Sequence, residues 1–167
     1  AFDKNPTAWQ SANSTSPGSV TQWDGSLQWL SENTPAEGTM GGADNEMEYY
    51  GTYQQTDDFE YPEGAYGVMS WWDYGHWITV RGERIPNANP FQQGAESAAN
   101  FLLAPNEEQA ETVLESQSTE GDQTRYVMVD WQMATPGSKF GAPTVWYDYN
   151  DTDLESSEFY ERVYSQN

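Results

Sequence analysis

Cysteine is absent from this chain of 167 residues, and histidine occurs once, at His76. Without thiols or a cluster of histidines, the composition argues against disulfides, zinc sites and haem attachment. Long apolar stretches are also missing, because no run of consecutive apolar residues exceeds four, whereas a membrane-spanning helix needs about 20. The sequence shows no secretory signal and begins at Ala1 rather than at Met. We therefore expect a soluble piece of a longer protein.

Basic residues are scarce as well. Six Lys and Arg stand against 27 Asp and Glu, which gives a formal net charge of −21. Self-repulsion would destabilise such a protein at ordinary ionic strength, but in molar salt the Debye length falls to about 3 Å. The eight Trp, eleven Tyr and six Phe argue against a disordered acidic chain. The composition therefore predicts a folded, halophilic protein that binds neither nucleic acid nor anionic lipid.

Local composition divides the chain into an arm and one domain. Residues 1–20 are rich in Ser, Thr, Asn, Pro and Gly, which is typical of a linker. Residues 21–167 are long enough for a single globular domain. Within it, residues 36–64 mix glycines, acids and tyrosines without a period and predict a long irregular loop.

Hydrophobic periodicity predicts the regular elements. Trp23, Leu27 and Leu30 recur at helical spacing, so we expect a helix over 21–34. After the loop, the patterns indicate a strand, a short helix or turn, a weak strand, two helices, a buried strand and a final helix, at 66–72, 76–80, 85–88, 95–102, 107–114, 126–129 and 159–164. Asn106 is the expected N-cap of the second long helix.

This order of elements indicates the fold class. Strand, helices and strand in succession form a parallel βαβ unit. We expect an α/β fold with a small parallel βαβ-type sheet and flanking helices, plus a long irregular N-terminal arm and loop. Asp73 and Asp130 each follow a predicted strand, and ligands of such sheets gather at the carboxyl ends of strands. If the two strands are neighbours, both acids lie at one edge of the sheet.

The most informative stretch is Trp71-Trp72-Asp73-Tyr74-Gly75. Two indole N–H donors stand beside one carboxylate acceptor, and a small hydroxyl group needs both kinds of partner. An isolated Trp-Trp pair is more often part of a core, so this alternative stays open at this point. We expect Tyr74 and Gly75 to shape the turn, with Gly75 supplying a positive φ.

These residues carry a resemblance to a known family. Residues 71–75 resemble the WWDYG motif of the catalytic subunit of oligosaccharyltransferase, the family that includes archaeal AglB and bacterial PglB. The segment with Asp130, Met133 and Lys139 is similar to the second acceptor-site element of that family, which reads Asp-x-x-Met-x-x-x-Lys on a kinked helix in one archaeal form. Lys139 comes two residues later than that pattern requires, after Pro136-Gly137-Ser138.

The resemblance implies recognition of an acceptor protein or peptide that carries Asn-X-Ser/Thr. In the family, the Trp-Trp-Asp triplet contacts the hydroxyl of the Ser or Thr, which assigns that role to Trp71, Trp72 and Asp73. A site built around a hydroxyl can reject an analogue without it by up to about 10⁴-fold or more. The other implied acceptor-binding residues are Tyr74, Gly75, Asp130, Met133 and Lys139.

The resemblance also implies what this chain lacks. In the family, a divalent metal, Mn or Mg, and its carboxylate ligands lie in a membrane portion that also receives the lipid-linked oligosaccharide. We therefore expect the present chain to bind no metal, to be inactive alone, and to face the outside of the plasma membrane.

Two other functions fit parts of the sequence. The many aromatic residues are compatible with a non-catalytic carbohydrate-binding or cell-surface module, and the 27 acids are compatible with a glycoside hydrolase that uses paired carboxylates. The oxygen-rich segment 148–155 lacks the central Gly and the final Glu of an EF-hand, so a solvated acidic face is the favoured interpretation over a calcium site.

Overall fold

Among the described residues, three short parallel strands form a sheet in the order β2-β1-β3. The computed structural model describes residues 18–45, 47, 61–117, 123–131 and 141–165. The strands are β1 (Tyr66–Met69), β2 (Ile85–Pro86) and β3 (Gln123–Val127). Both neighbours of the central strand β1 run parallel to it. The α/β fold class with a small parallel sheet is therefore confirmed.

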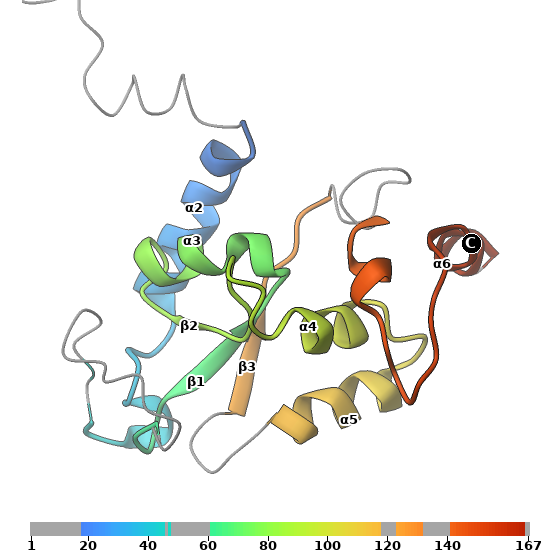
Figure 1. Cartoon of the computed structure of the whole chain (residues 1–167). Coiled ribbons are helices and arrows are strands. Elements are labelled where there is room, and N and C mark those ends of the chain that lie inside the picture. Colours follow the sequence, from blue (N-terminus) through green and yellow to red (C-terminus); the bar gives the residue numbers. More distant parts are fainter. Residues whose placement is uncertain (1–17, 46, 48–60, 118–122, 132–140, 166–167) are drawn as a thin grey trace, which may run out of the picture.

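Helices lie on both sides of this sheet. They are α2 (Gly18–Asn33), α3 (Gly75–Val80), α4 (Ala95–Leu102), α5 (Glu107–Gln117) and α6 (Ser156–Ser165). Short 3₁₀ turns occur at η1 (Met40–Gly42), η2 (Trp72–Tyr74) and η5 (Pro143–Trp146). Figure 1 shows α2 and α3 to one side of β1 and α4, α5 and α6 to the other. None of the described helices is long and apolar enough to cross a membrane.

Helix α2 is stabilised by packing its apolar stripe against the core. Trp23, Leu27 and Leu30 are 4%, 2% and 1% exposed, so the predicted face is the buried face. Local signals also fix the start of α5, where the Gln109 amide donates to Asn106 Oδ1 over 2.9 Å. The predicted N-cap is confirmed, and both helices lie close to their expected positions.

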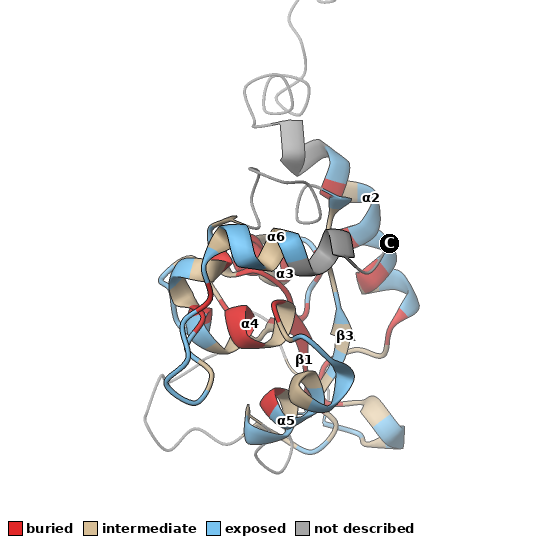
Figure 2. Ribbon diagram, turned by 90° about the vertical axis from the view of Figure 1, so that its right-hand side faces the viewer, coloured by how far each residue is buried: buried red, intermediate tan, exposed pale blue. Residues whose placement is uncertain are grey.

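The edge strand β3 differs from the expectation of a buried strand over 126–129. Val127 and Val129 are 48% and 57% exposed, and exposed and half-buried residues alternate along the strand (Figure 2). The prediction was wrong because every second side chain of β3 faces solvent, and among the described residues β1 is its one neighbouring strand. Its register with β1 also shifts between Gly67 and Val68, which leaves Arg125 as an extra residue.

A buried arginine closes the carboxyl end of α2. The Arg84 side chain is 3% exposed, and its Nη2 donates to the carbonyls of Ser31 over 3.0 Å and Thr34 over 2.7 Å. Glu37 lies nearby in the core, 2% exposed, and its carboxylate accepts from the amides of Tyr66 and Ile85 over 2.9 and 3.1 Å. These bonds satisfy backbone groups that helix and strand ends leave unpaired.

Parts of the predicted arm and loop lie outside the described residues, namely 1–17, 46 and 48–60. The domain boundaries at 20 and 21 therefore stay a prediction. The described ends of the loop are joined by backbone bonds, because the amides of Gly38 and Met40 both donate to the Gly64 carbonyl over 3.0 Å. This pairing brings the two sides of the loop together just before β1.

Candidate functional site

The motif lies in a turn at the carboxyl end of β1, not in the strand. We expected a strand over 66–72, but β1 ends at Met69 and η2 begins at Trp72. The neighbouring strand is tied to this point, since Ser70 Oγ donates to the Met128 carbonyl over 2.7 Å and the Met128 amide donates to the Met69 carbonyl over 2.9 Å. The carboxyl ends of two adjacent parallel strands therefore form one edge, as predicted.

Both indoles of the motif have buried donors. Trp71 is 1% exposed, Trp72 is half-buried, and their ring centroids lie 5.8 Å apart. Neither indole nitrogen is accessible, and neither has a hydrogen-bond acceptor in the described part of the chain. A buried N–H without a partner is uncommon in native proteins and indicates a functional site or a missing partner. Asp73, the next residue along the chain, has a half-buried side chain.

Asp130 is brought to the motif by β3. Its Oδ2 accepts from the Tyr74 hydroxyl over 2.8 Å and from the indole Nε1 of Trp23 over 3.1 Å. Tyr74 is fully buried, and the rings of Trp23 and Tyr74 are stacked with centroids 4.1 Å apart. Burial raises the pKa of the Tyr74 hydroxyl above its ordinary value, and its bond to Asp130 raises that pKa further. The hydroxyl is therefore neutral and a donor at physiological pH.

Gly75 is needed for close approach rather than for a special backbone angle. We expected a positive φ, but its φ is −54° in the right-handed helical region. A Cβ at this position would lie 2.2 Å from the Ala88 carbonyl oxygen and 2.7 Å from Asn89 Cα. Only glycine lets the segment after β2 pass directly against the start of α3.

Sequence reasoning missed Trp23. Its pattern marked it as a core residue of the first helix, and its stacking on Tyr74 agrees with that. Its second role, donation to Asp130, joins residues 107 positions apart, and no local signal indicates such a contact. Met133 and Lys139 lie outside the described residues, so their place at this site stays a prediction.

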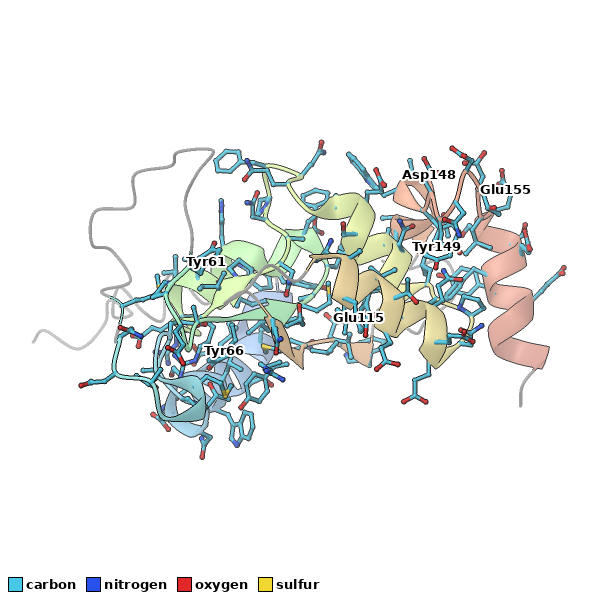
Figure 3. All side chains as sticks on the ribbon, turned by 90° about the horizontal axis from the view of Figure 1, so that it is seen from below. Tyr61, Tyr66, Glu115, Asp148, Tyr149 and Glu155 are labelled. Atoms are coloured by element: carbon cyan, nitrogen blue, oxygen red, sulfur yellow. The ribbon has the colours of Figure 1, made fainter. Side chains whose placement is uncertain are left out.

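The acidic segment 148–155 lies elsewhere. Figure 3 shows Asp148, Tyr149 and Glu155 near α4 and α6, at the end of the molecule opposite Tyr66. The acids of this segment are exposed. No group of three or more His, Cys, Asp or Glu that could hold a metal ion occurs in the described ranges, which include this whole segment. These acids form a solvated face.

A groove of about 380 Å³ runs beside the site, between α2 and the edge strand. Its lining includes Trp23 and Asp130 and continues along the chain through Tyr126–Trp131. The two residues that hold Tyr74 therefore also face this open space.

The chain is similar to known archaeal proteins over most of its length. Residues 20–134 match the AglB core-like family, described as the AglB core domain. The chain is 67% identical over 160 residues to a Haloferax volcanii protein named dolichyl-monophosphooligosaccharide–protein glycotransferase AglB. It is 39% identical over 149 residues to dolichyl-phosphooligosaccharide-protein glycotransferase 3 of Archaeoglobus fulgidus. These matches cover 95% and 83% of this chain but only 15% and 16% of the two relatives.

Solved structures agree with these matches. A crystal structure of an Archaeoglobus fulgidus oligosaccharyltransferase, tethered with an acceptor peptide containing the NVT sequon, is 38% identical with a TM-score of 0.57, covering 75% of this chain and 15% of that one. Other matches at 38% identity are described as a complex with an inhibitory peptide and a dolichol-phosphate, and as a complex with Zn and sulfate.

An isolated C-terminal globular domain of an oligosaccharyltransferase from the same organism matches at 26% identity and a TM-score of 0.56. The match covers 84% of this chain and 75% of that domain.

The motif turn and Asp130 both fall within residues 20–134, which match the AglB core-like family. On sequence and on structure together, the chain belongs to the AglB core-like family of archaeal oligosaccharyltransferases.

Proposed function

We propose that this chain is the acceptor-recognition domain of a membrane oligosaccharyltransferase, which transfers a lipid-linked oligosaccharide to Asn in Asn-X-Ser/Thr. Membership of the AglB core-like family supports this assignment, and so do the glycotransferase names of the relatives. Because the chain spans about 15% of those relatives, the remaining steps of the reaction are assigned to other parts of the polypeptide.

The observation that carries the proposal is the pair of unpartnered donors beside Asp73. The hydroxyl oxygen of an acceptor Ser or Thr has two lone pairs, and the indole N–H groups of Trp71 and Trp72 are two buried donors without acceptors among the described residues. The hydroxyl hydrogen is left to bond the Asp73 carboxylate. A bound hydroxyl would thus satisfy groups whose burial is otherwise costly, by about 1–3 kcal/mol for each donor.

The other site residues have supporting roles in this proposal. Met133 packs against the methyl group of an acceptor Thr, which favours Thr over Ser by roughly 0.8 kcal/mol. Lys139 is assigned to the second acceptor-site element together with Asp130 and Met133. Tyr74, Asp130 and Gly75 hold the turn that carries the donors, in agreement with the contacts of Tyr74 and the close packing of Gly75.

Metal and lipid belong to the rest of the enzyme. The described residues offer no group of three acids or histidines for a metal ion, so the donor set expected for Mn or Mg does not fit this part of the chain. We assign the divalent metal and the lipid-linked oligosaccharide to a membrane portion outside this chain. The domain then faces the outside of the plasma membrane and has no transferase activity alone.

The test is a glycosylation assay with the full-length transferase that carries this chain. Asp73→Ala should lower transfer to an Asn-Val-Thr peptide by about 10²–10⁴-fold, because the hydroxyl loses its acceptor. The wild type should discriminate against Asn-Val-Ala to a similar degree, and Asp73→Ala should lose most of that discrimination, because the two indole donors alone remain for the hydroxyl.

Asp44→Ala is the matched control, since Asp44 is exposed and lies outside the motif. It should transfer like the wild type. If Asp73→Ala transfers at the rate of Asp44→Ala and still prefers Asn-Val-Thr, the motif does not recognise the hydroxyl and the proposal is wrong.

A further inference from the structure

The turn that presents the two donors has little support of its own. Its three residues, Trp72–Tyr74, form a single 3₁₀ turn whose N-cap, Trp71, makes no side-chain capping bond. Short 3₁₀ segments have poor hydrogen-bond geometry and depend on their surroundings. The position of the Trp72 indole and the Asp73 carboxylate must therefore be fixed by contacts from other elements.

Trp23 provides such contacts from α2, far from the motif in the sequence. Its ring stacks on Tyr74 with an interplanar angle of 25°. It also forms an edge-to-face contact with Trp77 in α3, with ring centroids 6.0 Å apart. Its indole nitrogen donates to Asp130 Oδ2 over 3.1 Å, the same oxygen that accepts from the Tyr74 hydroxyl over 2.8 Å. One side chain thus contacts the turn, the helix that follows it and the segment that follows β3.

We propose that Trp23 is a positioning residue for the acceptor site, acting on the motif through Tyr74 and Asp130. This inference rests on the proposed function. Trp23 clamps the ring of Tyr74 between α2 and α3 and holds Asp130 in place as the acceptor for the Tyr74 hydroxyl. Tyr74 is the immediate neighbour of Asp73, so these contacts set the orientation in which Asp73 and Trp72 meet the hydroxyl.

Two substitutions separate the ring of Trp23 from its N–H group. Trp23→Phe keeps an aromatic ring for stacking but removes the donor to Asp130, whereas Trp23→Leu removes both. In the full-length transferase, Trp23→Phe should raise KM for an Asn-Val-Thr peptide about three- to tenfold, less than the full effect of a hydrogen bond to a charged group, because the lost bond reaches the acceptor only through Tyr74 and Asp130. The kcat should be unchanged, because Trp23 does not touch the reacting atoms. Trp23→Leu should raise KM further.

Trp29→Phe is the matched control. It makes the same substitution in the same helix at a side chain that is 56% exposed, and it should leave KM and kcat at wild-type values. Melting of each variant, followed by circular dichroism in molar salt, reports any general loss of stability.

Tyr74→Phe adds a double-mutant cycle. Trp23 and Tyr74 donate to one oxygen of Asp130, so their effects on KM should be coupled, and the double variant should differ from the product of the two single effects. A purely structural role predicts changes that follow the melting temperatures of the variants and leave KM at its wild-type value. The indole resonances of Trp71 and Trp72 in ¹H–¹⁵N spectra of this chain should also shift in Trp23→Phe and stay in place in Trp29→Phe.

The outcomes separate this inference from the proposed function. If Asp73→Ala is inactive but Trp23→Phe has the KM of Trp29→Phe, the positioning role is refuted while the acceptor site stands. A fall of kcat in parallel with stability, at unchanged KM, likewise refutes it and leaves a structural role. If Asp73→Ala transfers normally, the proposed function fails first.

Discussion

Replacing Arg84 by Met tests how the buried arginine holds α2. Besides the two carbonyls at Ser31 and Thr34, the guanidinium donates from Nε to Thr34 Oγ1 over 2.8 Å and from Nη1 to the Glu83 carbonyl over 2.7 Å. Helix α2 has no basic residue in its own last turn. Arg84 therefore supplies, from outside the helix, the positive charge that favours its carboxyl end.

The expected loss of stability follows from the buried carbonyls that Met cannot hydrogen-bond. Each hydrogen bond from a charged donor is worth about 1.5–3 kcal/mol, but bonds made by one group are not additive. Removing one member of a buried charged network typically costs about 3–5 kcal/mol. For a domain of this size, 1 kcal/mol lowers the melting temperature by about 2–4 °C, so Arg84→Met should melt roughly 6–20 °C below the wild type. Arg84→Lys keeps the positive charge but loses the planar, multiply donating guanidinium group. Its melting temperature should lie between those of the wild type and Arg84→Met.

The assay is thermal unfolding followed by circular dichroism in molar salt, which screens the repulsion among surface acids. Arg81→Met is the matched control, because Arg81 is a basic residue on the surface, 47% exposed, with an ion pair to Asp24. Exposed ion pairs contribute little, so this variant should melt with the wild type. Equal melting temperatures for Arg84→Met and Arg81→Met would refute the assigned role of Arg84.

Two further predictions concern the motif turn and its surroundings. Gly75→Ala should prevent native folding, because its Cβ would lie 2.2 Å from the Ala88 oxygen. Gly25→Ala in α2, where a Cβ meets nothing within 4 Å, should stabilise the folded state by about 0.5–1 kcal/mol. Equal denaturation midpoints for the two variants would contradict this prediction. Burial raises the pKa of Tyr74 from its ordinary 10.0, so the stability it contributes is complete below pH 10 and lost as the pH rises further, when the unfolded chain alone releases the proton. Burial also raises the pKa of Tyr66, which contributes in the same direction. Tyr74→Phe should therefore flatten only part of the fall of the unfolding free energy with pH above pH 10. An unchanged curve would contradict a buried, neutral Tyr74 hydroxyl.

Local patterns in the sequence were enough to predict the main helices and the edge of the sheet that carries the site, although the strands expected over 66–72 and 126–129 differ from β1 and β3. Apolar spacing identified α2, and a single Asn identified the start of α5, because both signals act within one or two turns of helix. The order of strands and helices predicted a parallel sheet, and a parallel sheet with adjacent strands places Asp73 and Asp130 at one edge. These successes share a cause: each depends on residues close in sequence or on chain topology.

The contacts that complete the site could not be predicted in this way. Arg84 and Glu37 are charged, and charged side chains are almost never fully buried unless they are paired, so no sequence pattern marks these two as core residues. Trp23 was correctly placed in the core, but its bond to Asp130 depends on how α2 packs across the sheet. The exposure of Val127 depends on which face of β3 is covered by other elements. All of these are tertiary properties that no sequence window contains.

These tertiary contacts give α2 a specific part in the site. Near its carboxyl end, Thr34 Oγ1 accepts from the hydroxyl of Tyr66, the first residue of β1, over 3.0 Å. Near its amino end, Trp23 stacks on Tyr74, which follows the other end of β1. The eleven steps from Trp23 to Thr34 correspond to roughly 16 Å of helix at 1.5 Å per residue.

Helix α2 therefore runs antiparallel to β1 and is attached at both ends of it, as Figure 1 shows for the two elements. Arg84 fixes the carboxyl end of the helix, and Trp23 connects its amino-terminal half to the motif turn. The chain has only six basic residues, and one of them, Arg84, lies in the interior, where it does not offset the repulsion among the surface acids. This burial is explained if the acceptor site requires α2 to be held at a fixed position along the sheet.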